Sequence, residues 1–208
     1  ITVIVDQTLS PFEKKQINLS NYSPEQLIAE YSDGYYNISV NILNVDGNDD
    51  DDINNNFMEK NVFAAWGKTQ RTTMIEHFSS STCGPCVSVN NTMNAVTSNN
   101  PGKFTYTKYQ MNWPSPGDLY YTPECSTRLS FYACDALPSV FFNGKLISPS
   151  EAQNLLDIDS NVPAYTNIRG AFDVEGNTIN IIADFMSYVK LENVAAFISI
   201  NEKETTGN

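Results

Sequence analysis

The chain has 208 residues, of which 41% are hydrophobic and 17% charged. A chain of this length and composition can bury the core of one elaborated domain, and it lies outside the low-hydrophobicity, high-charge range of disordered proteins. Its 12 basic and 24 acidic residues give a net charge of −12, which repels phosphate backbones and anionic headgroups. We therefore expect no nucleic-acid partner.

The sequence predicts no membrane-spanning segment. No stretch approaches the roughly 18–20 uninterrupted apolar residues that a spanning helix needs. The apolar residues 1–5 are followed at once by Asp6, without the basic flank and long apolar core of a signal peptide. If the natural protein is exported, its targeting segment and any membrane tether lie outside these residues.

The N-terminal segment, residues 1–67, is predicted to be rich in β-structure. Apolar and polar side chains alternate over residues 2–5 and 35–43, which is typical of half-buried strands. A serine-proline pair between them predicts a short helix over residues 24–31.

Acidic side chains concentrate in residues 46–52, and their mutual repulsion predicts a solvated loop. A calcium site is the alternative, because hard cations bind clustered carboxylates. Gly47 does not suit an EF-hand, which needs glycine at its sixth position with ligands on both sides.

Residues 68–163 are predicted to form an α/β domain. Strands are expected at 72–78, 104–111, 139–142 and 146–147, and helices at 85–98, 122–132 and 150–156. Strand-helix-strand units of this length imply parallel pairing, whereas the turn at Asn143-Gly144 implies a hairpin.

Residues 164–208 return to strand patterns. Three strands are expected, over 168–174, 178–189 and 194–200. Such a meander predicts a C-terminal antiparallel β appendage, an incomplete sandwich with an exposed edge.

The sharpest motif is Cys83-Gly84-Pro85-Cys86, which directly follows a predicted strand and opens a predicted helix. At a helix N-terminus the unpaired N–H groups and the dipole favour a thiolate, and Pro85 presets the first-turn dihedral. Cys83 is therefore expected to be the nucleophile, open to solvent. Cys86, one turn further on, is expected to be shielded and to resolve a mixed disulfide.

The cysteines have two alternative interpretations, a structural disulfide and a zinc site. A short structural disulfide between Cys83 and Cys86 would be inert. A zinc site would need a second ligand pair, and Cys125 and Cys134 lack the spacing of a zinc knuckle, so we expect no metal.

These residues resemble a known family. Thr82 and the Cys-Gly-Pro-Cys tetrad, a preceding Ile-Glu-His-Phe run at 75–78 and Leu137-Pro138 some fifty residues on are similar to the thioredoxin superfamily. Trp113-Pro114, the run at 117–121, Arg128 and the β extension resemble the exported thioredoxin-like outer-membrane lipoprotein group of Bacteroidetes. The likeness covers roughly residues 70–208.

The resemblance implies a thioredoxin-like fold and roles for individual residues. Cys83 matches the attacking cysteine, Cys86 the resolving cysteine and Pro138 the cis-proline that shapes the peptide-binding surface. The family's buried aspartate, six residues before the first cysteine, is replaced here by His77. Alternation along the strand puts His77 and Glu76 on opposite faces, so one of the two is expected to handle protons.

The residues expected to border a bound substrate are Gly84, Pro85, Trp113 and Leu137. The Gly84-Pro85 pair resembles the reducing members of the superfamily. Cys125 and Cys134 are expected either to form a structural disulfide or to pack as two small hydrophobic side chains. An unbroken helix between them opposes the bridge, because it separates their Cα atoms by about 1.5 Å per residue.

The function expected from these observations is that of an extracytoplasmic enzyme, a thiol-disulfide oxidoreductase acting as a protein disulfide reductase in the periplasm or at the outer-membrane surface. It would need no cofactor beyond its own redox-active disulfide. Its partners would be protein disulfides and a redox donor. The alternative is a surface-exposed binding or assembly protein that keeps the scaffold and uses the CxxC disulfide as a staple, since a fold permits either.

Overall fold

The structure is a computed structural model that describes residues 16, 33–45, 47–49 and 52–203. The strand expected over 2–5 and the helix expected over 24–31 lie outside the described residues. The chain divides into two units, Ile1–Gly67 with Tyr188–Lys190, and Lys68–Ser187 with Leu191–Asn208. The described part is mixed α/β, with one four-stranded and three two-stranded sheets.

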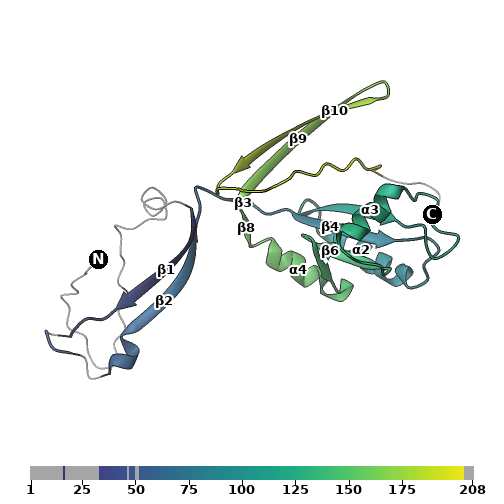
Figure 1. The fold of residues 1–208 in the computed structure, drawn as a ribbon. Coiled ribbons are helices and arrows are strands. Elements are labelled where there is room, and N and C mark those ends of the chain that lie inside the picture. The colour runs from purple at the N-terminus through teal and green to yellow at the C-terminus, as the bar shows by residue number, and fades with distance from the viewer. Residues whose placement is uncertain (1–15, 17–32, 46, 50–51, 204–208) are drawn as a thin grey trace. The chain divides into compact units, whose positions relative to one another are not determined.

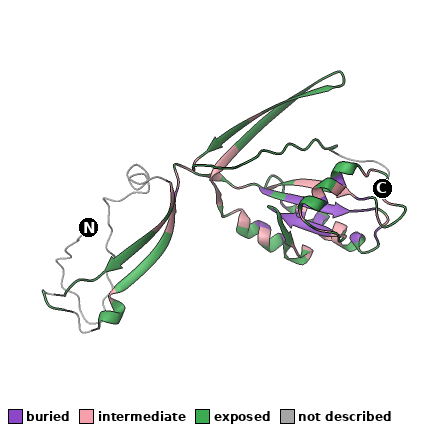
Figure 2. Ribbon diagram, in the orientation of Figure 1, coloured by how far each residue is buried: buried purple, intermediate pink, exposed green. Residues whose placement is uncertain are grey.

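The first unit contains an antiparallel hairpin. Strand β1 (Gly34–Asn41) pairs with β2 (Phe57–Ala64), and a short 3₁₀ helix, η1 (Ile53–Asn55), precedes β2 (Figure 1). The sequence predicted β1 but not β2. The prediction of half-buried strands is wrong for β1, whose Tyr35 is 83% exposed. Within the described residues this ribbon pairs with no third strand, and most of its side chains are exposed, apart from the end of β2 at Ala64 (Figure 2).

The second unit is built around a four-stranded sheet in the order β5-β4-β6-β7. Its strands are β4 (Thr73–Ser79), β5 (Phe104–Gln110), β6 (Ser139–Phe142) and β7 (Lys145–Ile147). The parallel pairing of β4 with β5 and the β6–β7 hairpin are confirmed. Asn143 and Gly144 both have positive φ, 48° and 81°, as a tight hairpin turn between twisted strands requires.

Helices cover both faces of this sheet. They are α2 (Cys86–Asn99), α3 (Pro123–Phe131), the 3₁₀ turn η2 (Pro149–Glu151) and α4 (Ala152–Asp159). Each lies close to its predicted range. Pro123 occupies the first turn of α3, where its missing N–H costs nothing. The side-chain amide of Asn100 caps the end of α2 by donating to the carbonyl of Val96 at 2.8 Å.

Alternation along the strands separates two cores. On one face, Ile75 packs with residues of α2 and α4, among them Met93 and Leu156. On the other face, Phe78 packs with Leu129 of α3 and with Phe141. Strand β4 is therefore buried from both sides, and the purple ribbon at the centre of the sheet in Figure 2 marks this burial.

The C-terminal part of the chain forms a second hairpin. A short pair, β3 (Thr69–Gln70) with β8 (Pro163–Ala164), leads into β9 (Thr166–Glu175) and β10 (Thr178–Ser187). The two strands predicted here and their exposed edge are confirmed. The third strand, predicted over 194–200, is absent: β10 pairs only with β9, and Asn193 turns the chain at a φ of 54°. Phe197 of this segment instead contacts Phe131 of α3.

The packing of one side of α4 on the sheet predicts how stability responds when side chains of this helix are shortened. Leu156 is fully buried, whereas Ile158 on the same helix is 54% exposed. We expect Leu156→Ala to lower the free energy of unfolding by about 2–5 kcal/mol, because it leaves a cavity. The matched variant Ile158→Ala should cost less than about 0.5 kcal/mol. Urea unfolding measures both, and equal losses would contradict the packing described here.

Candidate functional site

The CxxC motif lies in the turn between β4 and α2. Cys83 and Cys86 form a disulfide with Cα atoms 5.3 Å apart. The N–H of Cys83 donates to the carbonyl of Ser80 at 3.1 Å, and the N–H of Cys86 donates to the carbonyl of Cys83 at 3.2 Å. Cys83 therefore occupies the turn that leads directly into the first residue of α2.

Both sulfur-bearing residues are buried. Cys83 is 4% exposed and Cys86 is fully buried, while the intervening Gly84 and Pro85 are exposed. The shielding expected of Cys86 is present. The expectation that Cys83 is open to solvent is wrong for this disulfide-bonded state, in which the turn exposes Gly84 and Pro85 instead.

A neighbouring loop packs against the turn that carries Cys83. The hydroxyl of Thr82 donates to the carbonyl of Pro114 at 2.6 Å, and the N–H of Ser81 donates to the carboxylate of Asp118 at 2.7 Å. Asp118 is only 7% exposed and also accepts from the N–H of Tyr120. Asp118 was not among the predicted site residues, although its place in a Pro- and Gly-rich loop was a usable signal.

Gly117 allows this loop to close. Its φ is +90°, and a Cβ added there would lie 2.6 Å from the backbone oxygen of Asn112. Only glycine fits such a position. The Trp113–Pro114 and Ser115–Pro116 bonds of the loop are cis.

Pro138 lies at the end of the sheet that also carries the disulfide, next to the carboxyl end of β4. The Leu137–Pro138 bond is cis, as expected, and Ser139 pairs with Phe78 near the carboxyl end of β4. Because β5 is parallel to β4, the loop that carries Trp113 leaves from this edge as well. The structure therefore brings the disulfide, Trp113 and Pro138 to one end of the sheet, where β4 and β5 end and β6 begins.

His77 is fully buried on the face covered by α2. Its Nδ1 lies 2.7 Å from the hydroxyl of Tyr106, and its Nε2 is buried without a hydrogen-bond partner. Burial, and then the charge of Lys108 on the next strand, lower the pKa of His77 from 6.5 to about 4. The imidazole is therefore neutral at pH 7 and a weaker base than the sequence alone suggests.

Glu76 faces the other side of the sheet, toward α3. Arg128 donates to its two carboxylate oxygens, from Nε at 2.7 Å and from Nη2 at 2.9 Å, and Tyr109 and Tyr132 donate to it as well. The side chain is 3% exposed. Burial on its own would raise the pKa of Glu76, but the hydrogen bonds and the charge of Arg128 outweigh it and lower that pKa.

Glu76 therefore lies across the sheet from α2, and its ion pair with Arg128 joins β4 to α3. Of the two side chains expected to handle protons, it is His77 that shares a face of the sheet with α2.

Cys125 and Cys134 are free thiols, so of the two alternatives the structure contains the unbridged one. Cys125 is buried within α3, and Cys134 lies beyond its C-terminal end, half-buried, with its sulfur 3.3 Å from the hydroxyl of Ser139. The intact helical turns between them prevent a bridge.

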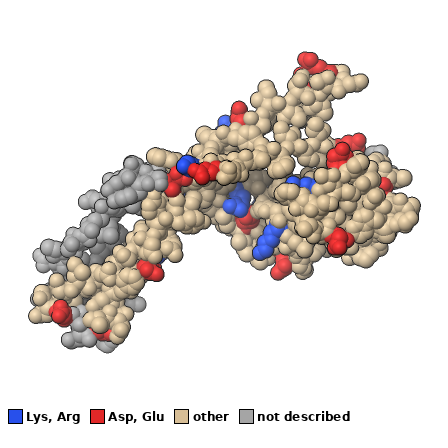
Figure 3. All heavy atoms as spheres, in the orientation of Figure 1, with Lys and Arg blue, Asp and Glu red and all other residues tan. Residues whose placement is uncertain are grey.

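Neither a metal-binding cluster nor a membrane-spanning helix is found in the described part of the chain. There, no group of three or more His, Cys, Asp or Glu side chains is placed to hold a metal ion. Part of the acidic loop, residues 46 and 50–51, lies outside that part. No helix among the described residues is long and apolar enough to cross a membrane. On the face in Figure 3, acidic side chains are scattered among uncharged ones.

Comparison with known proteins assigns the chain to no family. No family model matches the chain, and no curated protein matches it. Among solved structures, the crystal structure of protein AGR_C_4864 from Agrobacterium tumefaciens matches with a TM-score of 0.40 and 15% identity. The match covers 54% of this chain and 57% of that one, so the chain spans little more than half the length of this neighbour.

The Glu76–Arg128 pair should be costly to break. We expect Arg128→Ala to lower the free energy of unfolding by about 3–5 kcal/mol, because it leaves a buried carboxylate unpaired. Lys103→Ala is the matched control. It removes an ion pair with Asp157 whose side chains are 46% and 55% exposed, and it should cost less than about 1 kcal/mol.

Chemical unfolding of a third variant tests the explanation. Replacing both partners, Glu76→Leu with Arg128→Met, should recover part of the loss, since no buried charge is left alone. A double variant that is less stable than Arg128→Ala would contradict this account.

His77 should make stability depend on pH. Below pH 6.5 the unfolded chain binds a proton that the folded chain refuses until about pH 4, so the free energy of unfolding should fall by about 3 kcal/mol across that interval. His77 is the only histidine, and the lowered pKa of Glu76 acts only below 4.5. The free energy of unfolding, measured from pH 7.5 to 4.5, should show the decrease for the wild type and not for His77→Gln. If the two proteins instead lose stability in parallel as the pH falls, the buried neutral imidazole is refuted.

Proposed function

We propose that residues 68–163 form a thioredoxin-like domain and that the protein is a thiol-disulfide oxidoreductase. The observation that supports this most directly is the Cys83–Cys86 disulfide, which closes a short turn between a buried strand and a helix. Pro138 at the same edge of the sheet adds to it. The Gly84-Pro85 pair favours the reducing direction.

The proposed reaction starts from the dithiol. The thiolate of Cys83 attacks one sulfur of a substrate disulfide, and the other substrate sulfur leaves as a thiolate that takes a proton from water. Cys86 then loses its proton, attacks the sulfur of Cys83 and releases the second substrate thiol. Two electrons pass to the substrate, and Cys83 and Cys86 are left as the disulfide seen in the structure. A dithiol donor must then reduce this disulfide.

His77 is the side chain to which we assign the proton of Cys86. It projects to the face of the sheet that α2 covers, and with a pKa of about 4 it would hold that proton only in passing, before water takes it up. Glu76 is excluded by its position on the other face.

The setting of the reaction follows from the same proposal. A reductase of the exported lipoprotein type would work in the periplasm or at the outer-membrane surface. Its substrates would be protein disulfides, and its electron donor would be a second dithiol protein in that compartment. No cofactor beyond the cysteine pair is required by this chemistry.

A second candidate is a binding or assembly protein in which the disulfide is a structural staple. The 4% exposure of Cys83 favours it, because an attacking sulfur must be reached by its substrate. The two exposed hairpins, β1–β2 and β9–β10, offer surfaces for such a role.

Reduction of insulin by a small dithiol separates the two candidates. The wild type should accelerate the reaction, and Cys83→Ser should lower the rate to that of the dithiol without protein, because the attacking sulfur is lost. Cys125→Ser, which replaces a free thiol within α3, is the matched control and should keep the wild-type rate. Equal rates for the wild type and Cys83→Ser would favour the binding protein.

A further inference from the structure

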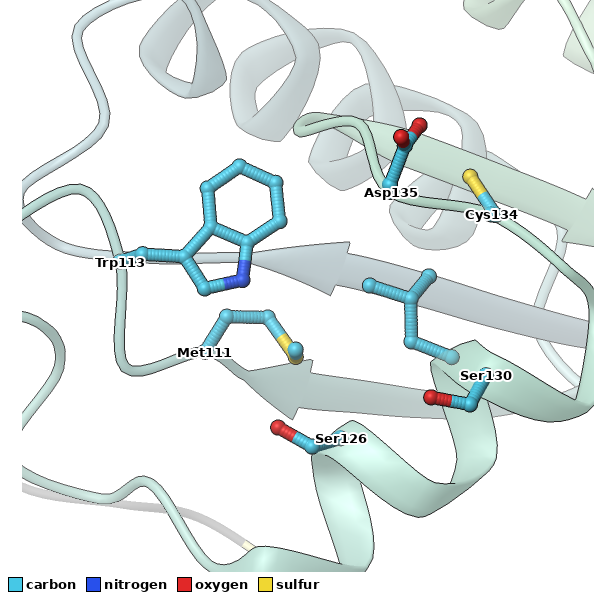
Figure 4. Close-up of a pocket in the computed structure, with 7 residues that line it drawn as sticks. Met111, Trp113, Ser126, Ser130, Cys134 and Asp135 are labelled. Atoms are coloured by element: carbon cyan, nitrogen blue, oxygen red, sulfur yellow. The ribbon is translucent and has the colours of Figure 1, made fainter.

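A pocket of about 280 Å³ opens on the α3 side of the sheet. Seven residues line it: Met111, Trp113, Ser126, Leu129, Ser130, Cys134 and Asp135. Figure 4 shows Ser126 and Ser130 directed from one side of α3 toward the open space, with Trp113 and Met111 at one end and Cys134 and Asp135 across from the helix. None of the reductase chemistry described above uses this pocket.

The pocket lies beside the disulfide-bearing edge of the sheet. One wall is the loop that begins with Trp113, and the carbonyl of the next residue, Pro114, accepts a hydrogen bond from Thr82, the neighbour of Cys83. The opposite wall, Cys134 and Asp135, leads within three residues to Pro138. The pocket is therefore walled by the two segments that lead to Pro114 and Pro138, beside the turn that carries Cys83.

The lining suits a particular kind of occupant. Met111 and Leu129 are buried and form an apolar floor, and the indole of Trp113 flanks it. The rim carries hydroxyl groups and the exposed carboxylate of Asp135, and no lysine or arginine lines the pocket. The volume accommodates one large side chain and is smaller than most pockets for drug-sized ligands, which hold about 300–1,000 Å³.

We propose that this pocket is a specificity subsite that takes one aromatic or large aliphatic side chain of the substrate polypeptide, near its disulfide and next to a basic residue. The apolar side chain lies on Met111 and Leu129 against Trp113, and the neighbouring cation pairs with Asp135. The subsite deepens the proposed reductase function and rests on it for the identity of the polypeptide as a substrate.

A cysteine-free peptide tests the binding step by itself. The probe carries a Phe-Lys pair with serine in place of the substrate cysteine, and its partner peptide has alanine in place of phenylalanine. Trp66→Phe leaves Trp113 as the one tryptophan reporter. The phenylalanine peptide should change Trp113 emission and bind about tenfold more tightly than the alanine peptide, because its ring leaves water.

Two variants of α3 test whether the discrimination between the two peptides arises in the pocket. Ser130→Leu fills the pocket and should abolish the discrimination, whereas Thr127→Leu, exposed on the same helix but outside the lining, should keep it. Asp135→Lys should weaken binding of the phenylalanine peptide by repelling its lysine. Equal affinities for the two peptides, or unchanged discrimination in Ser130→Leu, would overturn the subsite.

The outcome is separable from the reductase assay, because the probe has no disulfide. A wild type that discriminates between the peptides but does not reduce insulin supports the pocket and refutes the reductase. A wild type that reduces insulin but does not discriminate refutes the subsite alone.

Discussion

The ion pair between Glu76 and Arg128 ties the central strand of the second unit to α3. Glu76 is almost completely buried in the middle of the central strand, and a carboxylate in that position is tolerated only with a well-placed partner. Arg128 supplies it in bidentate geometry from α3. The pair therefore fixes α3 on the sheet, and α3 in turn supplies one wall of the pocket beside Trp113.

The other face of β4 carries a different polar group. His77 is buried there as a neutral imidazole bonded to Tyr106, so one strand holds an ion pair on one side and an uncharged titratable ring on the other. Glu76 is thereby tied to α3, whereas His77 lies on the face that α2 covers. The strand that precedes the Cys83–Cys86 turn is therefore packed on both of its faces.

Burial of Cys83 is the point on which the two functional readings differ. Hydrogen bonds from Ser81 and Thr82 to the loop at 112–118 hold that loop against the turn that carries Cys83. In a reductase this loop would also be part of the substrate surface, since it carries Trp113. In a binding protein whose disulfide is only structural, the same loop would cover and protect that disulfide.

Much of the second unit was accessible to sequence reasoning, because its signals are local. Period-2 and helical patterns, Pro123 at a helix start and Asn143-Gly144 at a turn predicted the elements to within a few residues. The Cys83–Cys86 disulfide followed from a three-residue spacing. The resemblance, in turn, implied the cis bond before Pro138.

Contacts between distant segments decided the rest. The pairing of Glu76 with Arg128, 52 residues apart, and the packing of Asp118 on Ser81 depend on how loops and helices meet, and no local pattern encodes this. The lowered pKa of His77 arises from burial and from Lys108 on a neighbouring strand, so it exists only once the parallel register is formed. Likewise, residues 194–200 have a strand pattern but no strand, because an alternating sequence needs a partner edge as well as its own propensity.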